Sequence, residues 1–329
     1  MSKNIYDKLV YNFDMKIKLH KANKEPFKVK AYVQAMNKLK QNVRIIKNVE
    51  DIKFYNFGKS IHEKSCWLLH NDSNLPEIED MSSTVTCIEE LTKIHNIGVT
   101  KAKDLVHNHN IKNISQLRER LELLNDKQRI GVKYHEDMQQ RIPRSEIVKH
   151  EEMIISTITN FHKTSKCEIV GSYRRQAHDS GDIDVIVSFN DDKIPPNFMK
   201  KLIEHFQDNQ YVPYDGIFAL GTKKFMGMCK LPTEKTFRRL DILITSLKEY
   251  PFALLYFTGS GEFNVKMREY ANTIGYSLNE KKLTKIGNET DEEELHVVIS
   301  NEKDIFDFLK IQYLSPQDRT AMNFKVLYN

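Results

Sequence analysis

Two aspartates stand one residue apart in the stretch IVGSYRRQAHDSGDIDVIVSF, inside an otherwise apolar run. Side chains alternate between the two faces of a β-strand, so Asp182 and Asp184 share one face of the predicted strand and the apolar residues take the other. Carboxylates held this close can share a proton, accept hydrogen bonds or bind a cation such as Mg²⁺. A D-x-D pair alone is more often an acidic strand end that faces water, so the metal hypothesis needs a further ligand.

Such a ligand is available in a second apolar run, FRRLDILITS, which predicts another strand with one acid at Asp241. If the two strands are neighbours in one sheet, Asp241 can join the face that carries Asp182 and Asp184. Three carboxylates on rigid strands are enough to bridge two Mg²⁺ ions about 3.5–4 Å apart.

The segment before the aspartate pair favours binding of a phosphate. CEIV predicts a short strand, and Gly171 and Ser172 form a turn that opens the next segment. Free backbone N–H groups at the start of a helix attract anions, and Arg174 and Arg175 add charge suited to phosphate. These pieces together predict a metal site beside a triphosphate-binding turn.

Length and composition indicate a soluble, intracellular protein with two or more domains. The 329 residues, 40 % of them hydrophobic, can form several cores, and 50 basic against 45 acidic side chains leave a net charge of +5. The four scattered cysteines are expected to be reduced thiols. The N-terminus lacks an apolar signal core, and no run approaches the ~20 apolar residues of a membrane span, so we expect no membrane association.

The sequence changes character near residue 140. Earlier segments, such as AYVQAMNKLKQNVRIIK, show the three-to-four spacing of amphipathic helices, whereas the later part alternates predicted strands and helices. The polar stretch HNDSNLPEIEDMSST, residues 70–84, is predicted to be a linker, and RIPRSE marks the passage between the two halves.

Two glycine turns lie in the helical half. NIGVTKAKDLV contains a tight turn at Gly98 that enters a helix, and YNFGKSIHEKS is a degenerate version of the same pattern. Such a turn points backbone amides at a DNA phosphate without reading a base, and the preceding carbonyls can hold a monovalent cation. One copy would more often be an ordinary helix connection, whereas two copies favour binding to the DNA backbone.

Several longer motifs follow one another in a fixed order: LNDKQRIGVKYHEDMQQRIPRSE, GSYRRQAHDSGDIDV, TKKFMGMCKLP, RRLDI, LYFTGSGEFN and NEKDIFDFL. In this the sequence resembles the family X DNA polymerases, most closely the polymerase beta branch, over nearly its entire length. The resemblance implies a multidomain α + α/β fold: a helical amino-terminal lyase domain with helix-hairpin-helix turns, then a polymerase domain with a nucleotidyltransferase palm sheet. The expected domains are 1–79 (lyase-like), 80–142 (DNA-binding), 143–246 (palm) and 247–329 (nucleotide selection).

The resemblance also implies two-metal nucleotidyl transfer. Asp182 and Asp184 would bind both Mg²⁺ ions, for which Mn²⁺ could substitute, and Asp241 would bind the catalytic ion and accept the proton of the primer 3′-hydroxyl. That hydroxyl would attack the α-phosphorus of a deoxynucleoside triphosphate (dNTP) and release pyrophosphate. Backbone at Phe257 would exclude a ribose 2′-hydroxyl. The residues expected at the nucleotide are Arg141, Ser172, Arg175, Gly181, Tyr256, Phe257, Gly259 and Asn264.

The implied substrate is gapped or nicked double-stranded DNA with a 5′-phosphate. By resemblance, Arg268 would test the nascent base pair, Arg239 and Lys224 would lie near primer and template, and Gly98 would face the DNA backbone. The carbonyls expected to hold Na⁺ or K⁺ at that turn belong to Thr92, Ile94 and Ile97.

The sequence departs from the polymerase beta pattern at several positions. Gln176 and Gly261 replace a glycine and an aspartate, Val265 replaces a lysine, and Lys281 replaces a tyrosine. Leu243 stands where an arginine helps to switch between open and closed states. These departures concern closure and fidelity, whereas the three aspartates of the chemistry are retained.

Aligning Gly58 with the family's glycine places Lys64 at the Schiff-base position of a 5′-deoxyribose-phosphate lyase. The amine must lose its proton to attack an aldehyde, so it needs cationic neighbours or partial burial. Ser60 and the acidic PEIED segment replace parts of the family's basic phosphate pocket, so we expect lyase activity weaker than polymerase activity. The positive charge at this lyase and DNA-binding surface is expected from Lys24, Lys28 and Lys59.

The leading hypothesis is therefore a monomeric gap-filling polymerase of base excision repair, located in the nucleus or another DNA-containing compartment. One alternative is a nucleotidyltransferase that acts on RNA or another acceptor, because G-S-x₉-D-x-D occurs throughout that superfamily; the glycine turns and LYFTGS argue against it. Another is a DNA-binding scaffold with an inactive catalytic site. The presence of Asp182, Asp184 and Asp241 argues against it, because loss of catalysis should have removed at least one of them. The short link TEKTF before RRLDI favours template dependence, because family members that work without a template carry a longer insertion there.

Overall fold

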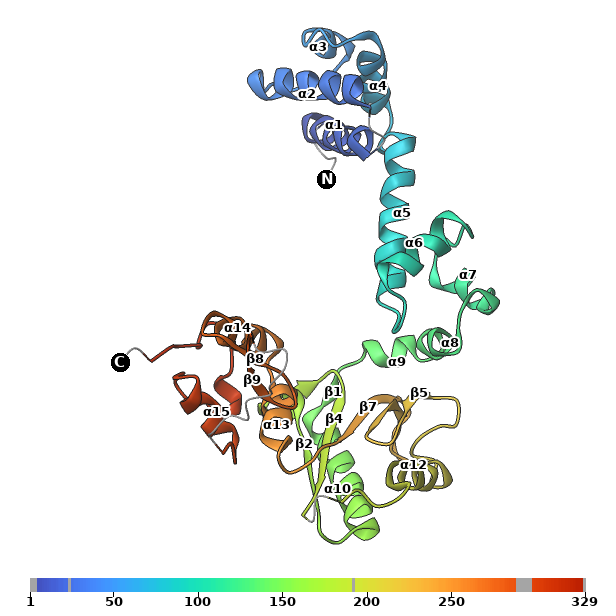
Figure 1. The fold of residues 1–329 in the computed structure, drawn as a ribbon. Coiled ribbons are helices and arrows are strands. Elements are labelled where there is room, and N and C mark those ends of the chain that lie inside the picture. The colour runs from blue at the N-terminus through green and yellow to red at the C-terminus, as the bar shows by residue number, and fades with distance from the viewer. Residues whose placement is uncertain (1–4, 23–24, 191–192, 288–297, 328–329) are drawn as a thin grey trace. The chain divides into compact units, whose positions relative to one another are not determined.

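The computed structural model describes residues 5–22, 25–190, 193–287 and 298–327. The chain divides into two compact units, Met1–Leu123 and Leu124–Asn329 (Figure 1). The predicted boundary between residues 79 and 80 falls inside a continuous helix of the first unit, α5 (Pro76–Thr92). Lys24, one of the predicted DNA-binding residues, lies outside the described residues.

In its described residues the first unit contains helices and no strand, as the spacing of its apolar residues predicts. Its helices are α1 (Ile5–Ala22), α2 (Pro26–Gln41), α3 (Val49–Lys53), α4 (Lys59–His70), α5 (Pro76–Thr92), α6 (Val99–His107), α7 (Ile114–Arg118) and the 3₁₀ turn η1 (Leu121–Leu123). Helices α1 to α4 enclose an apolar core, in which the ring of Phe13 meets Tyr32 and Phe57 edge-on at centroid distances of 5.7 and 5.5 Å.

The linker predicted over residues 70–84 is wrong from Pro76 onward, where α5 begins. Proline suits the first turn of a helix, where its missing N–H would have no partner, and Glu77 and Glu79 complement the positive end of the helix dipole. Ile78 is fully buried in the core of the unit. The polar composition of this stretch therefore belongs largely to a helix surface.

Two turns in the first unit repeat one backbone geometry. In each turn an asparagine with positive φ precedes a buried apolar residue and a glycine that caps the next helix. The φ angles of Asn56 and Asn96 are +45° and +66°, a region that asparagine tolerates better than most residues. The apolar residues and glycines of the two turns are Phe57 with Gly58 before α4 and Ile97 with Gly98 before α6.

The second unit alternates strands and helices. It begins with α8 (Asp126–Lys133), α9 (His135–Gln139), β1 (Ile142–Pro143), α10 (Arg144–Phe161), β2 (Ser165–Ile169), α11 (Gly171–Arg174), β3 (Asp179–Ser180), β4 (Ile183–Phe189) and α12 (Phe198–Asp208). It continues with β5 (Ile217–Leu220), β6 (Lys224–Cys229), β7 (Arg238–Ile244), α13 (Tyr250–Thr258), α14 (Gly261–Thr273), β8 (Tyr276–Leu278), β9 (Leu283–Lys285), α15 (Glu302–Phe308) and the 3₁₀ turn η2 (Pro316–Asp318).

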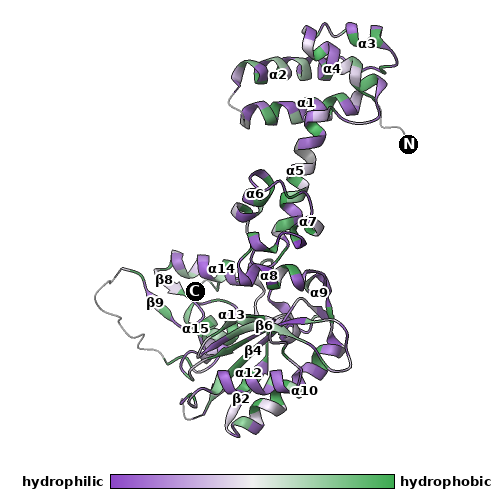
Figure 2. Cartoon of the chain, turned by 90° about the vertical axis from the view of Figure 1, so that its right-hand side faces the viewer, coloured by the Kyte–Doolittle hydropathy of each residue, from purple (hydrophilic) through white to green (hydrophobic). Residues whose placement is uncertain are grey.

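A five-stranded sheet in the order β2-β4-β7-β6-β5 forms the centre of this unit. β4 and β7 are parallel, and the other neighbours are antiparallel. One face packs against α10 and α12 through Val185, Val187 and Ile242, and the opposite face meets α13 at Ile186 (Figure 2). The apolar residues of the D-x-D strand thus lie on the face predicted for them, which leaves its acids on the α13 side.

A separate apolar core joins α13 and α14 to β8, β9 and α15. Phe263 and Phe306 are fully buried there, with stacked rings 6.0 Å apart. All four cysteines are free thiols. Among the helices of the described ranges, none combines the length and apolar character needed to cross a membrane.

Candidate active site

The two predicted acidic strands lie side by side. Asp184 on β4 and Asp241 on β7 occupy directly paired positions of the parallel ladder. Their carboxylates repel each other, and burial removes the water that would screen them. Burial and the neighbouring Asp241 raise the pKa of Asp184 to about 7, and burial raises the pKa of Asp241.

The glycine turn after β2 lies against Asp184. Gly171 begins α11 with a φ of +62°, a conformation unfavourable for residues with a Cβ. A Cβ at this position would stand 2.5 Å from Asp184 Oδ2. Glycine therefore lets the predicted phosphate-binding turn approach the carboxylate closely.

The third aspartate, Asp182, precedes β4 and forms an ion pair with Arg239 of β7. Arg239 Nε lies 3.8 Å from Asp241 Oδ1, which is beyond hydrogen-bond distance. Both atoms are buried and make no hydrogen bond to any described residue. The Arg239 guanidinium thus lies between two carboxylates and partly neutralises them.

The donor set of this acidic face suits a divalent cation. Buried carboxylates that repel each other, one of them with an oxygen free of hydrogen bonds to the described residues, are the hard ligands that Mg²⁺ and Mn²⁺ prefer. Among the described residues no three His, Cys, Asp or Glu side chains are grouped as metal ligands, and Asp182 is paired with Arg239 instead. Joint binding of a cation by all three aspartates therefore requires Arg239 to release Asp182.

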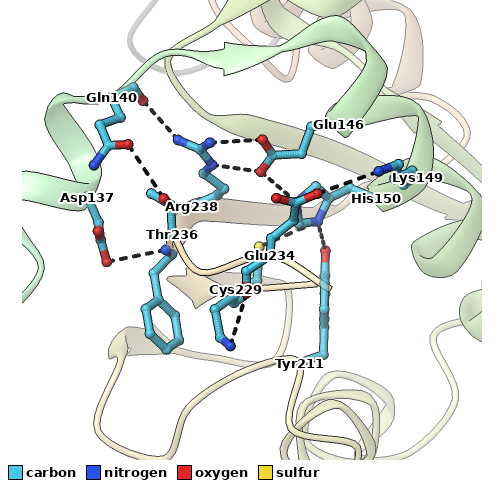
Figure 3. A network of polar contacts seen from close by, with 12 residues as sticks. Asp137, Gln140, Glu146, Lys149, His150, Tyr211, Cys229, Glu234, Thr236 and Arg238 are labelled. Atoms are coloured by element: carbon cyan, nitrogen blue, oxygen red, sulfur yellow. Dashed lines mark hydrogen bonds and ion pairs between the residues drawn. The ribbon is translucent and has the colours of Figure 1, made fainter. Parts of the chain in front are cut away.

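A buried ion pair on the core side of β7 anchors this strand (Figure 3). Because side chains alternate, Arg238 points away from Arg239 and donates from Nε and Nη2 to the two carboxylate oxygens of Glu146 on α10, both at 2.8 Å. Nη1 of Arg238 also donates to the Gln140 carbonyl at 3.2 Å. This bidentate pair holds the strand in the orientation that presents Asp241 to the site.

His150 lies in the same network and is completely buried. Its Nδ1 is 2.6 Å from the Tyr211 hydroxyl and 3.9 Å from Cys229 Sγ, while Nε2 is 3.7 Å from a Glu146 oxygen (Figure 3). Burial lowers the pKa of His150 to about 4, so the imidazole is neutral at physiological pH.

We expect His150 to make the second unit less stable in acid. The unfolded histidine takes up a proton near pH 6.5 and the folded one only near pH 4, so unfolding binds a proton between these values and stability falls as the pH drops. The loss should reach about 3 kcal/mol at pH 4. Urea titrations between pH 7 and pH 4 measure the free energy of unfolding. In His150→Met this free energy should no longer fall as the pH drops, whereas in a variant of the exposed His178 it should fall as in the wild type. An unchanged slope in His150→Met would contradict the assignment.

A cleft of about 740 Å³ opens over the acidic face. Every residue expected at the nucleotide lines it, and so do two of the aspartates and two of the predicted DNA-binding arginines. Asp241 and Lys224 are not part of its lining. The predicted residues that line the cleft are Arg141, Ser172, Arg175, Gly181, Asp182, Asp184, Arg239, Tyr256, Phe257, Gly259, Asn264 and Arg268.

One side of the cleft carries the groups suited to phosphate. Arg141 is exposed and paired with Asp179 at 2.6 Å, and a Cβ on Gly181 would stand 3.1 Å from its Nη1. The Ser172 hydroxyl donates to the Ser180 hydroxyl at 2.7 Å. Small residues therefore leave room for the Arg141 guanidinium and a hydroxyl to face an anion.

The wall opposite is built by the end of α13 and the start of α14. The rings of Tyr256 and Phe257 meet edge-on at 5.1 Å, and Gly259 has a φ of +71° that favours glycine. Arg175 Nη1 donates to the Thr258 carbonyl at 2.6 Å, which ties this turn to the phosphate side. Asn264 donates to the Tyr256 carbonyl at 2.7 Å, so its amide is held toward the cleft.

Arg268 of α14 also lines the cleft. Its Nε donates to the Leu278 carbonyl at 2.9 Å, and its guanidinium lies 5.6 Å from the centre of the Tyr256 ring. Lys224 begins β6, and its charge acts to lower the pKa values of Asp184 and Asp241.

Family models, curated relatives and a solved structure all show similarity between this chain and DNA polymerases. Family models match residues 89–139 as the fingers domain of DNA polymerase lambda, 141–246 as the DNA polymerase beta palm and 253–320 as the DNA polymerase beta thumb. DNA polymerase lambda of Rattus norvegicus is 27 % identical over 92 % of this chain and 54 % of its own length. DNA nucleotidylexotransferase of Xenopus laevis is 26 % identical over 71 % of this chain and 52 % of its own.

The crystal structure of Leishmania infantum polymerase beta in a ternary P/T complex superposes with a TM-score of 0.66 and 32 % identity, covering 72 % of this chain and 99 % of that chain. The protein belongs to the family X DNA polymerases. It spans about half the length of the curated relatives it matches. The multidomain fold expected from the sequence, with a helical amino-terminal region followed by palm and thumb, is confirmed.

Two of the positions at which the sequence departs from the family pattern line the cleft, and a third packs beside α13. Gly261 and Val265 line the cleft, and a Cβ on Gly261 would meet nothing within 4 Å. Leu243 packs into an apolar cluster with Tyr250, Leu254 and their neighbours, between β7 and α13. An apolar contact therefore stands where the family pattern has a charged switch.

A buried ion network of this family X chain was missed by the sequence analysis. Arg174 donates to Thr258 Oγ1 at 2.7 Å, to Glu168 at 2.9 Å and to both oxygens of Glu302 at 3.1 and 2.7 Å. Arg319 donates to the same Glu302 at 2.7 Å. Arg174, assigned from sequence to phosphate, thus connects α11 to α13 and α15, and it is Arg175 that lines the cleft. NEKDIFDFL was noticed as a motif, but nothing in its spacing pointed to the role of Glu302.

In the first unit, the structure gives the predicted lyase lysine different neighbours from those expected. Lys64 Nζ donates to Glu77 Oε1 at 2.6 Å, and Lys16 of α1 is a cation that the described part of the chain brings to the same oxygen. Lys28 is paired with Glu25 at 2.6 Å, and Lys59 is exposed at the first position of α4. Lys16 lies 48 residues before Lys64 in the sequence, so no local pattern could have connected them.

Gly98, at which the sequence analysis predicts contact with the DNA backbone, is exposed. Gly98 has a φ of −83°, which any residue can adopt, and a Cβ there would meet nothing within 4 Å. The same is true of Gly58, with a φ of −60°. Neither glycine is required by the fold itself. Of the carbonyls expected at a cation, that of Ile94 accepts a hydrogen bond from Ile97 N–H at 3.0 Å.

Proposed function

We propose that this protein is a template-directed DNA polymerase that fills short gaps in DNA repair and removes 5′-deoxyribose phosphate with its first unit. The observation that carries the polymerase assignment is the cleft that Asp182 and Asp184 line together with Arg141, Arg175 and the segment from Tyr256 to Gly259, with Asp241 paired to Asp184 on the neighbouring strand. The similarity to polymerases beta and lambda supports the substrate class.

The residues of the cleft divide the work of nucleotidyl transfer. Arg141, Ser172 and Arg175 bind the triphosphate and orient its α-phosphorus toward the primer. Asp241, whose pKa is raised by burial, accepts the proton of the primer 3′-hydroxyl as that oxygen attacks. Held by Asp182, Asp184 and Asp241, two Mg²⁺ or Mn²⁺ ions would lower the pKa of the hydroxyl and neutralise the leaving pyrophosphate.

The wall of the cleft selects the sugar and the base pair. Backbone at Phe257, which lies at the end of α13, leaves no room for a ribose 2′-hydroxyl in this proposal, and Tyr256 packs against the sugar. Asn264 contacts the minor-groove edge of the incoming base, and Arg268 the template side. Lys224 and Arg239 bind primer and template. The Arg239 guanidinium would then exchange its ion pair with Asp182 for the primer terminus.

The decisive experiment is primer extension on DNA with a one-nucleotide gap and a 5′-phosphate. In Mg²⁺ the protein should add one deoxynucleotide complementary to the template and discriminate against the matching ribonucleotide. A primer hybridised without a downstream strand and a single-stranded primer serve as comparison substrates. Absence of any addition to gapped DNA in Mg²⁺ or Mn²⁺ would refute the assignment.

The similarity to DNA nucleotidylexotransferase of Xenopus laevis suggests template-independent extension as a second candidate. The connection between β6 and β7 disfavours it, because Cys229 and Arg238 are joined by only residues 230–237, and family members that work without a template carry a longer insertion there. A connection this short leaves little protein to occupy the place of a missing template strand. Robust extension of the single-stranded primer would favour the second candidate.

The first unit is proposed to bind the DNA backbone at Gly98, with Na⁺ or K⁺ on the Thr92, Ile94 and Ile97 carbonyls, and to act as a lyase through Lys64. We expect Gly98→Leu to weaken binding of gapped DNA about tenfold or more, because its side chain would stand between the backbone amides and a phosphate. Thermal unfolding should be unchanged, since a Cβ at Gly98 meets nothing. Fluorescence anisotropy at several salt concentrations measures the affinity. Gly221→Leu, in the β5–β6 turn of the second unit, serves as a control. If both variants bind gapped DNA with equal affinity, the turn at Gly98 only connects two helices and does not bind DNA.

A further inference from the structure

A carboxylate stands among the groups of the cleft that are suited to phosphate. Asp179, the first residue of β3, accepts hydrogen bonds at Oδ1 from Nε and Nη2 of Arg141, at 2.8 and 2.6 Å. Nη2 of Arg141 also donates to the Asp179 carbonyl at 3.2 Å. Asp179 therefore binds one whole edge of the Arg141 guanidinium.

The third nitrogen of this guanidinium, Nη1, is directed into the phosphate side of the cleft. It makes no hydrogen bond to any residue that the structure describes, and a Cβ on Gly181 would stand 3.1 Å from it. Arg141, Gly181 and Ser172 all line the cleft. Because a guanidinium is a rigid plane, hydrogen bonds that hold Nε and Nη2 also determine where the two donors of Nη1 point.

The backbone and a histidine hold the carboxylate in place. Asp179 pairs with Pro143 in the short antiparallel ladder of β1 and β3, and Arg144 N–H donates to the His178 carbonyl at 3.0 Å. Nδ1 of His178 lies 2.9 Å from the second oxygen of Asp179, Oδ2. Both carboxylate oxygens are thus engaged, and Oδ1 stays turned toward Arg141.

We propose that Asp179 is a positioning residue for the incoming nucleotide: it holds Arg141 so that Nη1 points at the triphosphate before the nucleotide binds. This role rests on the polymerase function proposed above. Ordering a long, flexible side chain during binding costs free energy, and a guanidinium that is already held avoids most of that cost. Asp179 itself does not touch the nucleotide in this proposal.

The charge of Asp179 acts against this positioning effect, because a carboxylate repels a phosphate. The Arg141 and Asp179 side chains are 58 % and 26 % exposed, so water screens the repulsion, whereas the direction of the hydrogen bonds does not depend on screening. We therefore expect the positioning effect to be larger than the repulsion. Removal of Asp179 should weaken nucleotide binding if positioning dominates and strengthen it if repulsion dominates.

The first test compares Asp179→Ala with Asp179→Asn. Both variants lack the charge, but only asparagine keeps an oxygen that can accept from Nε and Nη2 of Arg141. The affinity for a fluorescently labelled dNTP is measured in Mg²⁺ on gapped DNA with a dideoxy-terminated primer, which cannot react. Asp179→Ala should bind this dNTP about fivefold more weakly than the wild type, and Asp179→Asn within about twofold of it.

Two further measurements separate this effect from a folding defect. Asp179→Ala should unfold at the wild-type temperature, because an exposed ion pair adds little stability, and at saturating dNTP it should fill gaps at the wild-type rate. Asp126→Ala is the matched control, since Asp126 is an exposed acid paired with Arg129 on α8. Unchanged dNTP affinity in Asp179→Ala, or tighter binding by both Asp179 variants, would overturn the inference.

The second test is a double-mutant cycle with Arg141. Arg141→Met should weaken dNTP binding about tenfold, and adding Asp179→Ala should cause no further loss, because no guanidinium remains to be positioned. An equal loss from Asp179→Ala in both backgrounds would overturn the role through Arg141. A wild type that neither binds dNTP on gapped DNA nor adds it would refute the polymerase function itself, whereas an active wild type with unaffected Asp179 variants would overturn the role of Asp179 alone.

Discussion

Replacing Asp184 with alanine is expected to abolish gap filling, lowering nucleotide addition at least about a thousandfold. Asp184 is the carboxylate paired with Asp241 across β4 and β7, and its Oδ2 lies against the Gly171 turn that is proposed to bind phosphate. Its loss would remove one of the three carboxylates that are proposed to hold the divalent cations. Single-turnover addition of one nucleotide to gapped DNA is the measurement.

Stability and DNA binding should separate this loss from unfolding. Burial and Asp241 raise the pKa of Asp184, which means that the charged carboxylate is unfavourable in the folded protein. Asp184→Ala should therefore unfold at the wild-type temperature or above and bind gapped DNA with similar affinity. Asp208→Ala, at the exposed end of α12, should retain activity. If Asp184→Ala adds nucleotides in Mg²⁺ at nearly the wild-type rate, the catalytic role assigned to Asp184 is wrong.

A second large effect is expected at Glu302, where replacement by alanine should destabilise the second unit by about 3–5 kcal/mol. Glu302 is 5 % exposed and accepts hydrogen bonds from Arg174 and from Arg319, which is itself 1 % exposed. These bonds outweigh burial and hold the pKa of Glu302 below its usual value. Without the carboxylate the buried Arg319 and the partly buried Arg174 would lose the counter-ion that they share.

Thermal unfolding of the second unit should reveal this as a fall of about 6–20 °C in Tm. Lys303 is the matched control, because it is the next residue of α15 and its ion pair with Asp307 is exposed. Lys303→Ala should leave the unfolding temperature close to that of the wild type, because an exposed ion pair contributes little to stability. Equal unfolding temperatures for the two variants would show that the network does not hold α15 to α11.

The sequence was most informative where function depends on local pattern. Period-two alternation placed Asp182 and Asp184 on one face, which Asp241 could join if its strand was a neighbour, and the structure shows Asp184 and Asp241 in register on neighbouring strands. The motifs also identified the groups that line the cleft, because each motif is a short segment whose residues act together. Strand, turn and helix assignments in the second unit followed from the same periodicities.

Partners distant in sequence were not predictable. Nothing in the alternation of β7 shows that Arg239 turns to Asp182, and Lys16 and Glu77 reach Lys64 from two other helices. The predicted linker failed for a related reason, since a polar stretch is compatible with either a loop or an exposed helix face until its packing is known. Ion-pair geometry is decided by tertiary packing, which residue periodicity does not encode.

The Arg174–Glu302 pair also bears on how the chain is made. Arg174 precedes Glu302 by 128 residues, so at ordinary rates of synthesis its partner emerges about 6–26 s later. All five strands of the central sheet are complete by Ile244, well before α15 exists. Until α15 docks, Arg174 must therefore remain hydrated or be held by Glu168 and Thr258, which are synthesised earlier. The docking of α15 is therefore a late step of folding during translation. In the interval before it, the apolar side of α13 that α15 later covers is exposed and could bind a chaperone.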